Sequence, residues 1–171
     1  MSQQPATDDL RTYPSPVPVP ALDATPPGPY RGVYGMPMFV TVPTADLSGS
    51  ADFWARGLGF FDLFTIPGQL THLRRWAFQD VLLASGGRPE EASSVAINVA
   101  CVPGELDGIR AACEALAPGC TDGPHRMPWN AVELRVVTPE NARVTMTAGL
   151  PLEPGSAQER YLREIGIDLP A

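Results

Sequence analysis

The fold is indicated by one stretch of sequence, FVTVPTADL at residues 39–47, followed by ADFWARGLGF at residues 51–60. Its β-branched first part ends at Pro43, and an Asp or a Ser residue can then cap a helix. Gly59 follows where the exit of a helix needs a residue that tolerates positive φ, and FFDLFTI at residues 60–66 resumes an extended pattern. The apolar residues between the cap and the glycine share one helical face, at Leu47, Ala51, Trp54 and Leu58. A strand, a helix and a second strand are therefore predicted.

Two further strands complete a first module. Residues 70–78 and 81–84 predict strands that are joined by a tight connection at Gln79-Asp80. The polar, turn-rich segment 85–91 then separates this module from the rest of the chain. The first module, residues 36–87, thus has the order strand, helix and three strands.

The same order occurs a second time in residues 93–149. A strand is indicated by alternation of Val95, Ile97 and Val99 with Ser94, Ala96 and Asn98. A helix over residues 106–116 and strands near residues 120–123, 132–137 and 143–147 come next. The fold class is therefore predicted as α+β, with two tandem βαβββ modules that arose by duplication of a unit too small to bury its own sheet face. Residues 150–171 form a tail in which residues 156–165 are compatible with a short helix.

Residues 1–35 form a proline-rich arm that cannot be helix or central strand. Two interpretations stay open. The arm can be a disordered leader, or it can be an extended segment that covers a cleft or wraps a partner subunit, with Tyr30 and Tyr34 as anchors.

Composition restricts the possible partners. The 171-residue chain has a net charge of −7, and its twelve basic residues are all Arg and are scattered, so a nucleic-acid partner is not expected. It contains no apolar run long enough to span a bilayer and no signal-peptide pattern at its N-terminus, so we expect no membrane partner and a cytoplasmic location. Cys101, Cys113 and Cys120 lack the spacing of a zinc site or a disulfide framework, which favours free thiols.

Two stretches carry a resemblance to a known family. Residues 53–60, FWARGLGF, resemble the F-W/Y-x-x-x-L-G-F signature of the glyoxalase, bleomycin-resistance and dioxygenase superfamily, also called the vicinal oxygen chelate (VOC) superfamily. Residues 137–145, VTPENARVT, occupy the place of its D-P-x-G-N turn and last strand, with Thr138 and Asn141 in place of the Asp and the Gly. The resemblance implies paired βαβββ modules whose sheets curl around a cup, usually completed in a homodimer.

Within the superfamily, the chain looks most similar to bleomycin-resistance proteins. The shared features are Phe53-Trp54 in the first helix, Arg74-Arg75 in the third strand and the ending Thr147-Ala148-Gly149.

The superfamily's enzymes hold a divalent metal with His and Glu side chains in the cup. By resemblance, the metal-ligand positions fall on four places in this sequence. They are Phe39, a position near Leu83, either Ser94 or Ala96, and Thr145. None of these residue types is a normal metal ligand, so we predict no metal and no other cofactor. The chain contains only two histidines, His72, which is expected in the third strand, and His125, which is expected in a loop over residues 124–128.

Without metal ligands, the cup becomes a lined pocket for a small molecule. Trp76, Trp129, Phe39 and Phe61 are candidate stacking surfaces, whereas Trp54 is expected in the core. Asn98 needs a hydrogen-bond partner, which can be a ligand or the cross-strand residues Thr41 or Thr147. Glu133 offers a carboxylate to a cationic ligand, or forms an exposed ion pair with Arg135. The complete predicted ligand-binding set is Phe39, Thr41, Phe61, Trp76, Leu83, Asn98, Trp129, Glu133 and Thr145.

These observations support one leading hypothesis and two rivals. The leading hypothesis is a metal-free, homodimeric protein that sequesters or carries an aromatic or peptide-type natural product, as in antibiotic self-resistance. The first rival is a metal-independent enzyme of natural-product biosynthesis that performs isomerisation, cyclisation or lyase chemistry, with Glu133, His125 or Asp80 transferring a proton. The second is a structural partner protein that acts through its proline-rich arm.

Overall fold

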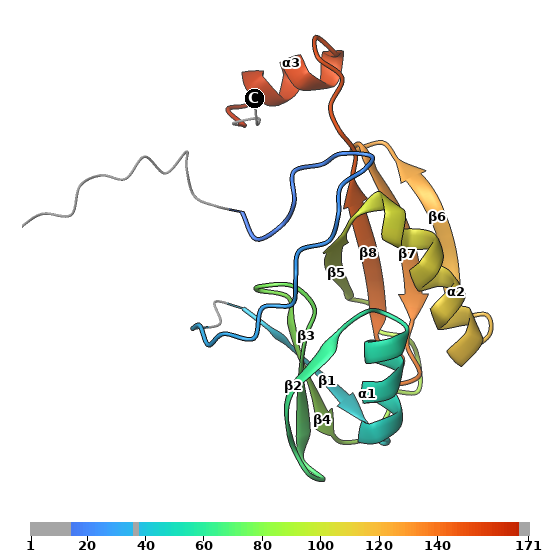
Figure 1. Ribbon diagram of the computed structural model, residues 1–171. Helices are drawn as coiled ribbons and strands as arrows, with labels where there is room; N and C mark the ends of the chain where they lie inside the picture. Colours follow the sequence, from blue (N-terminus) through green and yellow to red (C-terminus); the bar gives the residue numbers. More distant parts are fainter. Residues whose placement is uncertain (1–14, 36–37, 168–171) are drawn as a thin grey trace, which may run out of the picture.

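The computed structural model describes residues 15–35 and 38–167 (Figure 1). Both predicted modules are present and have the predicted order. The first contains β1 (Val40–Thr44), α1 (Leu47–Arg56), β2 (Phe61–Ile66), β3 (Leu70–Arg74) and β4 (Asp80–Ser85). The second contains β5 (Ala96–Cys101), the 3₁₀ turn η2 (Pro103–Glu105), α2 (Leu106–Leu116), β6 (Thr121–Met127), β7 (Ala131–Val137) and β8 (Arg143–Gly149). A last helix, α3 (Ala157–Glu164), is capped by the Ser156 side chain.

Each module forms one four-stranded mixed sheet. The strand orders are β1-β4-β3-β2 and β5-β8-β7-β6, and only the pairs β1–β4 and β5–β8 are parallel. The two orders are equivalent position by position, which confirms the duplication expected from the sequence. Neither sheet is closed.

Several strand boundaries differ from the sequence prediction, above all at β3 and β6. β3 ends at Arg74 and β4 already begins at Asp80, because residues 75–79 form a turn in which Phe78 has a φ of 63°. β6 extends to Met127 and therefore contains His125, which the sequence placed in a loop. Pro124 is accommodated in this strand because the pairing with β7 shifts register between Asp122 and His125.

The core lies on the helix side of both sheets. In the first module Val42, Leu73 and Leu83 pack towards α1, whose Trp54 is fully buried as predicted. In the second module Val99, Leu134, Val136 and Met146 have the same role beneath α2. Because side chains alternate along a strand, the neighbouring residues project to the opposite side, which we call the open face of each sheet.

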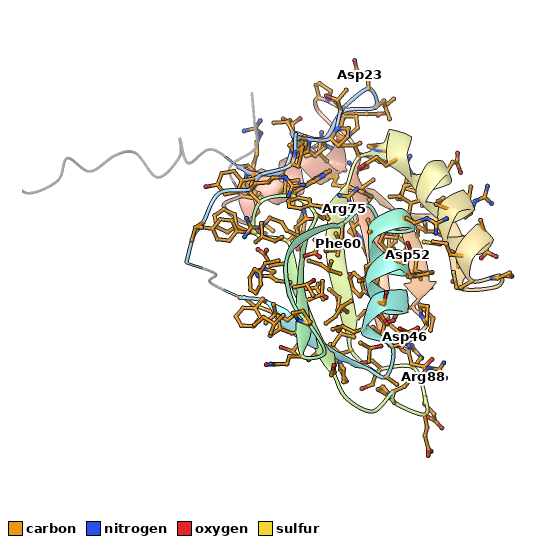
Figure 2. The ribbon with its side chains drawn as sticks, turned by 60° about the horizontal axis from the view of Figure 1, so that its bottom comes forward. Asp23, Asp46, Asp52, Phe60, Arg75 and Arg88 are labelled. Carbon is orange, nitrogen blue, oxygen red and sulfur yellow. The ribbon has the colours of Figure 1, made fainter. Side chains whose placement is uncertain are left out.

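Two buried charged side chains join the modules. The Glu140 carboxylate, from the turn before β8, accepts hydrogen bonds from Trp54 Nε1 at 2.5 Å and from Ser50 Oγ at 3.0 Å, both on α1. Arg75 donates to the carbonyl oxygen of Ala100 at 2.6 Å and pairs with Glu105 at 2.8 Å, so it reaches from the first module to the second (Figure 2).

The described part of the arm, residues 15–35, contacts both sheets. It runs from the end of β8 towards the first sheet (Figure 1). At the second sheet Pro20 lies against Gly149, where a Cβ added to the glycine would come within 3.1 Å of the proline ring. At the first sheet, Arg74 Nη1 donates to the carbonyl oxygens of Tyr30 at 3.1 Å and Gly32 at 2.8 Å. No helix in the described residues combines the length and apolar character that a bilayer crossing requires.

Candidate ligand-binding site

An open cavity of about 800 Å³ lies between the arm and the open face of the second sheet. The arm supplies a mostly apolar wall that includes Val17, Pro18, Val19 and Pro20. The opposite wall comes from β5, β7 and β8, and its polar groups are Asn98, Glu133 and Thr147. The arm segment 15–24 makes no hydrogen bond to the sheet among those that the structure describes, so this wall is held by apolar contact and by the attachment of residues 30–34 to the first sheet.

Glu133 reaches the cavity because of the alternation of β7. Leu134 and Val136 enter the core on the helix side, which directs Glu133 and Arg135 to the open face. The Glu133 side chain is buried, with the residue 9% exposed. Its Oε1 accepts a hydrogen bond of 2.9 Å from Trp129 Nε1, in the turn between β6 and β7. Trp129 itself is 57% exposed, so its ring lies at the surface beside the cavity.

The basic side chains that share the open face with Glu133 contact a different carboxylate. His125 is the register partner of Glu133 on β6, but its Nε2 lies 2.8 Å from Asp122 Oδ1. Arg135 Nη1 lies 3.4 Å from the other oxygen of Asp122. These contacts, above all the hydrogen bond with His125, lower the pKa of the Asp122 carboxyl. Asp122, rather than Glu133, is therefore the carboxylate that these two side chains contact.

Cys101 also borders the cavity, but its side chain packs into the hydrophobic core on the helix side of β5, as that of Val99 does. Burial raises the pKa of its thiol to about 12, so the thiol is neutral at physiological pH and carries no nucleophilic thiolate. The remaining wall is apolar or carries neutral amide and hydroxyl groups.

The open face of the first sheet is arranged differently because the arm already covers the part of it around Asp80 and Arg74. Asp80 Oδ1 lies 2.7 Å from Arg74 Nε and 2.9 Å from His72 Nε2, and its Oδ2 accepts the Tyr34 hydroxyl proton. The guanidinium carbon of Arg74 also lies 4.1 Å from the centre of the Tyr34 ring. Burial, followed by the hydrogen bond to Asp80, raises the pKa of Tyr34 to about 12. Asp80 is thus engaged in holding the arm.

The structure divides the predicted site residues between different environments. Asn98 and Glu133 line the cavity, and Thr145 lies on the same open face, opposite Asn98 and Arg135. Phe39, Thr41 and Phe61 belong to the first module; Phe39 is 44% exposed and Phe61 lies under the guanidinium of Arg31. Leu83 is on the helix side within the core, because its partner Val42 fixes that face, and Trp76 is almost fully buried.

The groups proposed for proton transfer are likewise separated. Glu133 and His125 are neighbours on the second sheet, whereas Asp80 is on the first. The cavity residues that sequence reasoning missed come mainly from arm positions 15–24, which have no periodic pattern. Gly149 was a detectable signal, because a strand glycine often marks a site where another segment approaches closely.

A metal of the kind implied by the resemblance does not fit the residues present. Within residues 15–35 and 38–167, no group of three or more His, Cys, Asp or Glu side chains is placed to hold an ion. Two pairs of a histidine and a carboxylate are present there, His72 with Asp80 and His125 with Asp122, and in each pair an arginine guanidinium also contacts the carboxylate. A third donor is missing and a fixed positive charge takes its place.

Sequence comparison finds neither a known family nor a curated protein that matches the chain. Solved structures do match. The fosfomycin resistance protein FosX from Listeria monocytogenes, complexed with Mn(II) and sulfate, is 15% identical and aligns over 78% of this chain and 99% of its own, with a TM-score of 0.56. An integron cassette protein from the mobile metagenome of the Halifax Harbour sewage outfall is 21% identical over 68% of this chain and 99% of its own, with a TM-score of 0.53.

A lactoylglutathione lyase from Agrobacterium tumefaciens gives the same result, with 19% identity, coverage of 66% of this chain and 92% of its own, and a TM-score of 0.51. At these identities the likeness concerns the fold, and it agrees with the signature at residues 53–60. The chain has the fold of the glyoxalase, bleomycin-resistance and dioxygenase (VOC) superfamily.

Proposed function

We propose that this protein binds a small molecule between its arm and its second sheet and holds it without chemical change. The supporting observation is the cavity of about 800 Å³, which falls within the range of about 300–1,000 Å³ that is usual for drug-sized ligands. Its walls combine an apolar majority with a few fixed polar groups, which is the usual composition of such sites.

The proposed ligand is an aromatic or peptide-type natural product, and the biological role is its sequestration or transport, as in antibiotic self-resistance. Proline and valine side chains of the arm provide flat apolar surface, while Asn98 and Thr147 can exchange hydrogen bonds with amide or hydroxyl groups of a ligand. The exposed ring of Trp129 offers an additional stacking surface beside the cavity.

A metal-independent enzyme is the alternative, and one observation favours it. Glu133 and His125 are cross-strand partners on the open face, so a carboxylate and an imidazole are adjacent. The His125 ring is nevertheless hydrogen-bonded to Asp122, and Asp80, the third candidate, is bonded to Arg74 and Tyr34. Binding without reaction requires none of these groups to be free.

We also propose that the protein acts as a homodimer. The open face of the first sheet exposes large apolar side chains that the arm leaves uncovered, among them Phe39, Phe64 and Ile66. A second copy of the chain would remove this surface from water.

The binding function is tested with paired substitutions on β5. Ala100 lines the cavity, whereas Ala96 lies on the same face of the same strand outside it. Candidate peptide-type and aromatic antibiotics are titrated by calorimetry, with and without a chelator, and the bound compound is recovered for mass spectrometry. We expect Ala100→Phe to abolish binding, Ala96→Phe and the chelator to have no effect, and the compound to return unaltered. A converted compound would establish the enzyme, and equal binding by both variants would rule out the cavity.

A further inference from the structure

We propose that the cavity selects ligands that carry a protonated amine, which Glu133 binds. This inference rests on the proposed function and specifies the chemistry of its ligand. Among the lining residues that the structure describes, the geometry identifies Glu133 as the one charged group, and the others are apolar or neutral. A ligand that supplies the opposite charge at this point is therefore favoured over a neutral or anionic molecule of the same shape.

The protein itself does not neutralise this carboxylate. On β7, Arg135 faces the same side as Glu133 but pairs with Asp122, and on β6 His125 does the same. From β8 and β5, the facing residues are Thr147, Thr145 and Asn98, all uncharged, and Arg143 pairs in register with Ala96 at the far end of the face. Residues 15–35, the described part of the arm, contribute no basic residue to the cavity wall.

The hydrogen bonds of Glu133 leave room for a ligand. Oε1 accepts the Trp129 indole proton, whereas Oε2 accepts no hydrogen bond from any residue that the structure describes. Glu133 is about nine-tenths buried as a residue, yet its Oε2 is not a sealed atom, so a ligand in the cavity can reach it. An ammonium group at Oε2 would form a charge-assisted hydrogen bond with the carboxylate.

The bond to Trp129 does not by itself explain a carboxylate at this position. An indole N–H is a single neutral donor, and the amide oxygen of a glutamine would accept it equally well. The negative charge is the property that distinguishes Glu133 from a glutamine. A cationic group of a ligand is attracted by this charge, whereas a neutral group is not. The overall charge of −7 acts in the same direction by attracting cationic ligands to the protein.

The test uses matched pairs of probes, each pair consisting of a primary amine and the corresponding alcohol on one aromatic or peptide-like body. Binding is followed at neutral pH by nuclear magnetic resonance, with the Trp129 indole N–H and the backbone amides of residues 98–101 as reporters. We expect the amine of a pair to bind about 10- to 100-fold more tightly than the alcohol. Glu133→Gln should remove this preference and retain the binding of the alcohol, while Glu91→Gln, which deletes an exposed carboxylate in the segment between the modules, should leave the preference unchanged.

The outcomes separate this inference from the proposed function. If amine and alcohol bind the wild-type cavity equally, or if Glu133→Gln keeps the preference, the selection for amines is wrong and the binding function stands. If no pair shifts the reporters at millimolar concentration, the cavity is not a ligand site, and both proposals are overturned. A reduced preference in Glu91→Gln would assign the effect to overall charge and would likewise overturn the role of Glu133.

Discussion

Trp54 and Glu140 lie 86 residues apart in the chain, yet the indole Nε1 of the first and the Oε1 of the second are 2.5 Å apart in the buried joint between the modules. The other oxygen of Glu140 accepts the Ser50 hydroxyl proton, so one carboxylate satisfies two donors of α1. We therefore expect Glu140→Ala to destabilise the protein by about 1–3 kcal/mol for each donor left unpaired. Urea unfolding measures this loss. Glu140→Gln retains one acceptor and should cost less; equal losses in the two variants would contradict the explanation.

Tyr34 should control the attachment of the arm to the first sheet. Its hydroxyl group donates to Asp80 and accepts from the Phe78 backbone N–H at 2.7 Å. Tyr34→Phe removes both bonds but preserves the ring that lies over Arg74, so we expect faster proteolysis within residues 15–35 and little change in global unfolding. Tyr161→Phe, on the exposed side of α3, is the matched control. Unchanged proteolysis of the arm in Tyr34→Phe would show that the stacking contacts hold it alone.

Alkaline pH should release the same attachment. In the folded protein the pKa of Tyr34 is raised from its ordinary value of 10.0 to about 12, so the native state favours the protonated hydroxyl. The resulting contribution to stability is complete below pH 10 and is lost as pH rises from 10 to about 12, because the unfolded chain loses this proton first. Tyrosinate absorbance should show a step near pH 12 that is absent in Tyr34→Phe. The prediction fails if both proteins have the same titration curve.

The proposed homodimer depends on the open face of the first sheet. Phe64 is 48% exposed and Phe39 is 44% exposed on this side, so replacing either by Asp should introduce an unpaired charge into an apolar contact. We expect sedimentation equilibrium to give twice the chain mass for the wild type and a shift to monomer for Phe64→Asp. Leu22→Asp, at an exposed position of the arm, should remain dimeric. A wild-type mass of one chain at micromolar concentration would rule out the dimer.

The sequence was most informative where periodicity was strong. Alternation along residues 132–137 correctly predicted that Glu133 and Leu134 face opposite sides of the sheet. The signature at residues 53–60 correctly indicated the superfamily fold. The position of Leu83 was inferred from the resemblance, whereas its actual side is set by its own pairing with Val42. His125 was assigned to a loop because Gly123-Pro124 interrupts the strand pattern, which β6 tolerates through a register shift. The arm contacts could not be predicted, because proline-rich sequence has no period that selects a face.

The order of synthesis determines when the contact between Pro20 and Gly149 can form. Pro20 is among the earlier residues made, but its partner surface exists only after β8, the last strand, has joined the second sheet. The cavity therefore cannot form before β8 has been synthesised, and its closure joins segments of very long sequence separation, which costs more chain entropy than a local contact.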